Sequence, residues 1–91
     1  MSAVRPFVDS LVMLAMQPED QGARIIKAER TVADCLVPAG SNPQKQLARL
    51  EELEKALRTA AQLNPRASKF LTEIVIEFIE QQKRSLSLPG L

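Results

Sequence analysis

The stretch Phe70–Leu86, FLTEIVIEFIEQQKRSL, decides the fold because it is the most apolar part of the chain. On a helix at about 100° per residue, its apolar face covers roughly half of the circumference. The face consists of Leu71, Ile74, Val75, Phe78, Ile79, Gln82 and Leu86, with Phe70 at one edge. So wide a face must be covered by more than one neighbour. The stretch therefore predicts the central helix of a bundle, although the β-branched run 73–80 leaves a strand as the alternative.

Prolines divide the chain into helical segments, because proline fits the first turn of a helix and ends a preceding one. The predicted helices begin at Pro6, Pro18, Pro43 and Pro65 and end near residues 16, 37, 61 and 84. Asn42 is expected to cap the third helix, or Ser41 and Gln44 to form a capping box there. The expected fold is all-α: one domain, 1–91, in which three long helices and one short N-terminal helix form an antiparallel bundle. Residues 84–91 are its tail.

The third predicted helix has the clearest pattern. Its apolar residues follow the 3-4-3 spacing of a coiled-coil seam, namely Leu50, Leu53, Leu57 and Ala60. Two Glu-first pairs in this helix stand four residues apart, Glu51 with Lys55 and Glu54 with Arg58. Each pair is expected to stabilise the helix by a few tenths of a kcal/mol.

The second predicted helix has one polar residue within its apolar face. That face is expected to consist of Ile25, Ile26, Val32, Ala33, Leu36 and Val37. Glu29 lies in its middle, where a carboxylate must be paired, kept protonated, or exposed by a split face. The structural interpretation is an internal ion pair or a splayed helix. The functional interpretation is an interface with another chain, where one buried polar group fixes the register.

The composition argues against catalysis. The chain has no histidine, tyrosine or tryptophan, so the usual general base and the commonest metal ligand are missing. Its single cysteine, Cys35, has no histidine partner and is expected to be a packed thiol. We expect no enzymatic activity, no metal, no cofactor and no small-molecule substrate. One cysteine also excludes an intramolecular disulfide, which favours the cytoplasm, and no apolar run is long enough to cross a bilayer.

Two charged strips stand out, although the net charge is only +1. The acidic strip on the fourth helix consists of Glu73, Glu77 and Glu80. It is interpreted as a solvated face, or else as a docking strip for a basic partner. An enzyme or metal protein that uses these carboxylates is the rival interpretation, although the Glu-x-x-His signature of di-iron bundles is missing. The basic strip on the second helix consists of Arg24, Lys27 and Arg30. Three cations without stacking aromatics are a weak signal for phosphate contact, so a small nucleic-acid-binding regulator is kept only as an alternative function.

The supply of apolar residues suggests an interaction surface. Exposed apolar patches generally mark such surfaces. The predicted partner-binding residues are Phe7, Leu11 and Leu14 of the first helix, Ile76 pointing away from the main face of the fourth, and Leu86, Leu88 and Leu91 of the tail. The alternative is that these residues close the core of a monomer. The sequence thus predicts a non-catalytic protein–protein interaction module, such as an adaptor, chaperone-like or regulatory subunit, that binds a protein partner or forms a homodimer.

Residues 41–82 are predicted to form a helical hairpin, with Ser41-Asn42-Pro43 before its first helix and Asn64-Pro65 before its second. This layout resembles the hairpins of small helical subunits and chaperones of bacterial type III secretion. The resemblance is one of architecture and leaves out residues 1–40. It implies an assembly subunit of a secretion-type complex as a further alternative, and it assigns no functional residue.

Overall fold

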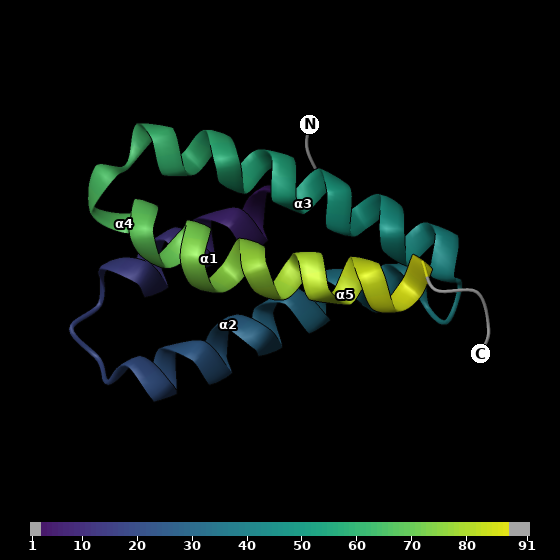
Figure 1. The fold of residues 1–91 in the computed structure, drawn as a ribbon, viewed down its shortest axis with the longest axis horizontal. Helices are drawn as coiled ribbons and strands as arrows, with labels where there is room; N and C mark the ends of the chain where they lie inside the picture. Colours follow the sequence, from purple (N-terminus) through teal and green to yellow (C-terminus); the bar gives the residue numbers. More distant parts are fainter. Residues whose placement is uncertain (1–2, 88–91) are drawn as a thin grey trace.

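A computed structural model describes residues 3–87, and within this range all regular structure is helical. The elements are α1 (Arg5–Met16), α2 (Gln21–Leu36), the 3-10 helix η1 (Val37–Ala39), α3 (Pro43–Leu63), α4 (Pro65–Phe70), the π-helix η2 (Leu71–Ile76) and α5 (Glu77–Ser87). The last three follow one another without a break and form one continuous helix (Figure 1). The all-α class is confirmed, and the strand considered for residues 73–80 is wrong.

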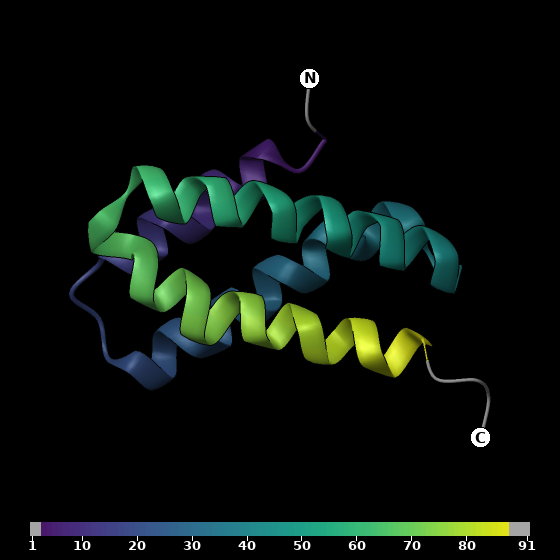
Figure 2. The same cartoon turned by 45° about the horizontal axis from the view of Figure 1, so that its top comes forward.

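The chain reverses direction at Asn64, so the α4–η2–α5 helix runs back along α3 and contacts it over its length (Figure 1). α1 and α2 pack against each other and cross one side of this hairpin (Figure 2). α1 contacts α3, α4 and η2, whereas α2 contacts α3 and η2. The helical hairpin is therefore the scaffold on which the first two helices lie.

Side-chain caps determine where two of the helices begin. The Asn42 carboxamide oxygen accepts hydrogen bonds from the backbone N–H groups of Gln44 (3.0 Å) and Lys45 (3.2 Å). The predicted Asn42 cap is therefore present. α2 begins at Gln21 and not at Pro18, because the Asp20 carboxylate accepts the N–H of Ala23 at 3.3 Å and is the N-cap. The C-terminal helix also differs from its prediction, since it continues past Arg84 to Ser87.

The face of α2 that enters the core agrees with the predicted one only in part: Val32 is buried and Leu36 packs against the core. The buried residues of α2 are Ala28, Val32 and Cys35, which follow the i, i+4, i+7 spacing of one helical stripe. Two of them are small, so this stripe lets α2 approach its neighbours closely, and the larger apolar residues lie beside it. Ile26, Ala33 and Val37 are exposed. Glu29 is exposed as well, so it is not a buried polar residue, and of the alternatives given for it the structure agrees with exposure by a split face.

The π-helical turn explains why Ile76 is buried. In an α-helix Ile76 would point away from the face that carries Leu71, Val75 and Ile79. A π-helix holds more residues per turn, so Ile76 is rotated toward that face. All four side chains are at most 2% exposed. The prediction that Ile76 points away from the main apolar face is therefore wrong, and the one-turn change in helical pitch is the reason.

Candidate functional site

The residues predicted to bind a partner lie mostly inside the molecule. Leu11, Leu14 and Ile76 are buried in the core, and Phe7 and Leu86 are partly buried and pack against it. These five side chains therefore help to close the core and do not form one exposed face. Leu88 and Leu91 lie outside the described residues.

The exposed apolar side chains lie elsewhere. The large ones among residues 3–87 are Met13, Met16, Ile26, Val37 and Leu63, each more than half exposed. Met13, Met16 and Leu63 gather where the outer side of α1 meets the C-terminal end of α3. The sequence contains one signal for the methionines. The apolar residues of the first helix follow i, i+3, i+4 spacing at Phe7, Val8, Leu11, Val12 and Ala15, and both methionines fall outside this pattern.

Between α1 and α3 lies a hollow of about 710 Å³, which we call the α1–α3 groove. Its apolar lining consists of Val8, Val12, Met13, Ala56, Ala60 and Leu63. At one border Arg5 and Asp9 form an exposed ion pair at 3.2 Å. A second hollow, lined by Met16 and Pro65, shares Leu63 and Asn64 with it. The two hollows thus make one largely apolar surface, whose charged lining residues are the Arg5–Asp9 pair in the first hollow and Arg66 in the second.

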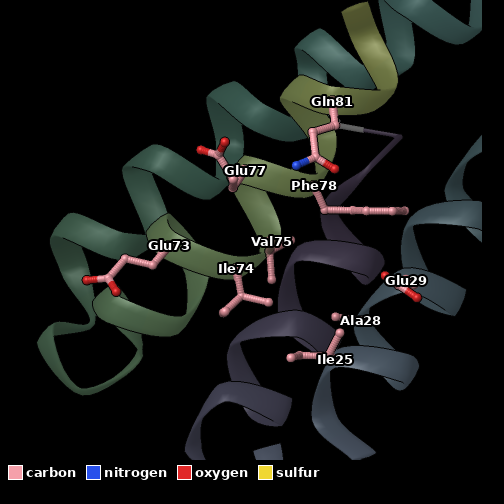
Figure 3. Close-up of a pocket in the computed structure, with 9 residues that line it drawn as sticks. All are labelled: Ile25, Ala28, Glu29, Glu73, Ile74, Val75, Glu77, Phe78 and Gln81. Carbon is pink, nitrogen blue, oxygen red and sulfur yellow. The ribbon is translucent and has the colours of Figure 1, made fainter. Parts of the chain in front are cut away.

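A smaller hollow of about 220 Å³, which we call the α2–α5 groove, lies between α2 and the η2–α5 segment. Its apolar lining consists of Ile25, Ala28, Ile74, Val75 and Phe78 (Figure 3). Glu29 lies on the α2 side, and Glu73 and Glu77 lie on the opposite side with their carboxylates directed away from the floor (Figure 3). The structure therefore brings Glu29 and two members of the acidic strip to one groove.

The third member of the acidic strip, Glu80, faces another way. Its carboxylate lies 3.9 Å from Nη2 of Arg58 on α3. Arg58 also binds Glu54 at 2.9 Å, and Glu54 accepts a hydrogen bond from Lys83 Nζ at 3.1 Å. Burial would raise the pKa of Glu54, but the hydrogen bonds from Arg58 and Lys83 outweigh it and hold the pKa below its ordinary value. Glu80 thus belongs to a network that joins α3 to α5.

The basic strip is largely engaged within the molecule. Arg24 donates from Nη1 to the carbonyl oxygen of Ala15 at 3.1 Å, and its guanidinium lies 5.0 Å from the centre of the Phe70 ring. Lys27 forms an ion pair with Glu19 at 2.8 Å. Arg30 is exposed. Among residues 3–87, Arg24 and Lys27 of the strip thus make contacts within the molecule, and no salt bridge is formed by Arg30.

The single thiol is fully buried. Cys35 is 0% exposed. The Arg49 guanidinium donates from Nε to the backbone carbonyl oxygen of Cys35, and its Nη2 lies 3.7 Å from the Cys35 Sγ. Burial raises the pKa of this thiol in spite of the nearby guanidinium. A buried thiol with a raised pKa is poorly reactive, because the thiolate is the nucleophile. Cys35 is the packed thiol that the sequence predicts.

Within residues 3–87, no three acidic or cysteine side chains lie close enough to hold a metal ion. No helix in the same range is long and apolar enough to cross a membrane. No protein-family model, curated protein or solved structure matches this chain. The resemblance of residues 41–82 to type III secretion subunits, and the assembly function that it implies, therefore stay predictions.

Proposed function

We propose that this chain is a non-catalytic protein-interaction module whose α1–α3 groove binds an amphipathic helix of a protein partner. One observation carries the proposal: of the five large exposed apolar side chains, Met13 and Leu63 line this groove, and Met16 lines the hollow that adjoins it at Leu63. Exposed apolar residues scattered singly need no explanation, whereas a contiguous patch indicates an interaction site. The partner-binding side chains are then Met13, Met16 and Leu63, in place of the predicted set.

The lining of the groove suits a helix. Ala56 and Ala60 lie one turn apart on α3 and line the groove with small side chains, so a partner backbone can approach α3 closely. Met13 and Met16 border it with flexible, polarisable side chains that adapt to different apolar shapes. A partner helix would place residues i, i+3, i+4 and i+7 against this surface. Since the groove has only the Arg5–Asp9 pair at its border, we expect a weak dependence of binding on salt.

A peptide titration tests this proposal. The probe is a synthetic helix with leucines at i, i+3, i+4 and i+7 and glutamines on its other faces, titrated against protein carrying ¹³C-labelled methionine methyls. Met13 and Met16 are the methionines of the described range, and both signals are expected to shift together. The variant Met13→Glu/Leu63→Lys places charges in the groove at unchanged net charge. It should weaken binding at least about tenfold, because those charges must be desolvated.

The matched control is Ile26→Glu/Val37→Lys, which changes two equally exposed apolar residues outside this groove. It should bind the peptide like the unchanged protein. If both variants bind equally well, the α1–α3 groove is not the docking surface. Light scattering on the same proteins shows whether a second copy occupies the groove. In that case the unchanged chain is a dimer and Met13→Glu/Leu63→Lys is a monomer.

A further inference from the structure

The α2–α5 groove differs from the α1–α3 groove in its charge. Its lining includes three carboxylates, from Glu29, Glu73 and Glu77, and no lysine or arginine. Within residues 3–87 none of these carboxylates forms a salt bridge. Arg24, Arg66 and Lys69 line an adjoining hollow, which shares Glu73 and Ile74 with this groove. Glu29 and Glu77 do not line that hollow.

The floor of this groove is apolar and only partly covered. Ile25, Ile74 and Phe78 are half-buried, whereas Ala28 and Val75 beneath them are buried. In Figure 3, Ile74 and Val75 point from the η2 turn toward Ile25 and Ala28, and Phe78 reaches across toward α2. This arrangement leaves room for a large aliphatic side chain between two helices, with carboxylates on both sides of it.

We propose that the α2–α5 groove is a second docking site, which binds an amphipathic helix with an apolar ridge and cationic flanks. The ridge contacts Ile25, Ile74 and Phe78. Lysine or arginine side chains on one flank pair with Glu29, and those on the other pair with Glu73 and Glu77. The aliphatic stems of such side chains cover apolar surface while their charged ends reach the carboxylates. A divalent cation is a poorer occupant, because the carboxylates do not converge on one point.

This site lies apart from the α1–α3 groove, and the two share no lining residue. With both occupied, the chain holds two helices of different chemistry at once, one neutral and one cationic. This would make it an adaptor that joins two partners. Neither site depends on the other, so each proposal can fail alone.

The test compares three labelled peptides with the same leucine ridge and with lysine, glutamine or glutamate at the flanking positions. Fluorescence anisotropy measures their Kd at low and high salt. The lysine peptide should bind most tightly and lose affinity as salt is raised, because its ion pairs are screened. Glu29→Gln/Glu77→Gln should weaken its binding about three- to tenfold, as expected for two partly exposed ion pairs.

The matched control is Asp34→Asn/Glu51→Gln, which removes the same charge from exposed positions outside the groove. It should change Kd less than about twofold. A second pair tests the floor: Ile25→Ser should weaken binding, whereas Ile26→Ser, at the neighbouring exposed position, should not. Circular dichroism confirms that each variant folds.

Three results would overturn the proposal. The glutamate peptide could bind as well as the lysine peptide, or the two charge variants could weaken binding equally. Alternatively, Met13→Glu/Leu63→Lys could abolish binding of the lysine peptide, which would place it in the α1–α3 groove. Loss of glutamine-peptide binding in that variant, with lysine-peptide binding retained, would support both sites.

Discussion

The α3 hairpin and α2 are attached to the same core by different means. α3 contributes Leu50, Leu53 and Leu57, each 0% exposed, whereas α2 contributes Ala28, Val32 and Cys35. The free energy gained by burying a side chain is roughly proportional to the apolar area that it removes from water, and small residues remove little. α2 therefore depends more on directional contacts, made by Arg24 to the Ala15 carbonyl and by Arg49 to the Cys35 carbonyl.

This difference indicates which part of the molecule opens most easily. Local opening has a lower free energy where few large apolar side chains are buried. α2 should therefore separate from the scaffold before the α3 hairpin unfolds. α2 forms one side of the α2–α5 groove. We therefore expect the α2 side of that groove to move more easily than the η2–α5 side. The α1–α3 groove, in contrast, is lined partly by the helix that holds the three buried leucines.

Truncating a buried leucine of α3 should have the largest effect. Leu57→Ala removes a fully buried side chain and should lower the free energy of unfolding by about 2 to 5 kcal/mol, because lost burial and the remaining cavity add. Val32→Ala on α2 should cost on the order of 1 to 2 kcal/mol. Urea denaturation followed by circular dichroism measures both. An equal loss in the two variants would remove the proposed distinction between α3 and α2.

Removing the arginine that fixes α2 should have an intermediate effect. Arg24→Ala loses a charged hydrogen bond to Ala15 and the contact with the Phe70 ring. The free energy of unfolding should fall by about 1 to 2 kcal/mol. Cys35, the only thiol and fully buried on α2, reports local opening through its rate of labelling by a disulfide reagent. The labelling rate should rise by a larger factor than the measured fall in the free energy of unfolding predicts, because α2 opens locally.

The control for Arg24 is Arg66→Ala, an exposed arginine on α4 without an ion pair among the described residues. Its Cys35 labelling rate should match that of the unchanged protein. If Arg24→Ala also leaves this rate unchanged, Arg24 does not hold α2 in place.

Sequence patterns predicted the hairpin better than α2 or the docking surfaces. The leucine spacing of α3 is sufficient because three large residues on one stripe leave little choice of buried face, and Leu50, Leu53 and Leu57 are all buried. In α2 the isoleucines outweigh the small residues in any hydropathy pattern. The face is instead chosen by close packing of Ala28 and Cys35, which depends on neighbours that the pattern does not contain.

Neither the burial of Ile76 nor the two grooves could be predicted from sequence patterns. The π-turn rotates Ile76 into the core, and a helical projection at constant pitch cannot predict that rotation. The α2–α5 groove joins Glu29 to residues more than forty positions away, so its acidic border appears only when α2 crosses the hairpin. The α1–α3 groove needs the relative placement of Met13 and Leu63, which no local spacing encodes.

The smallest effect is expected at the ion-pair network that joins α3 to α5. Glu54→Gln removes the acceptor shared by Arg58 and Lys83, and because these pairs are partly exposed it should cost about 0.5 to 1 kcal/mol at pH 7. The folded-state pKa of Glu54 is lowered, so this contribution is fully present above the unfolded pKa and is lost as pH falls through the folded pKa. Urea midpoints of the two proteins should therefore differ at pH 7 and begin to converge as pH falls below about 4. The control Glu51→Gln, at an exposed position on the same helix, should leave the urea midpoint at pH 7 nearly unchanged. A pH-independent difference for Glu54→Gln would mean that packing, not charge, joins α3 to α5.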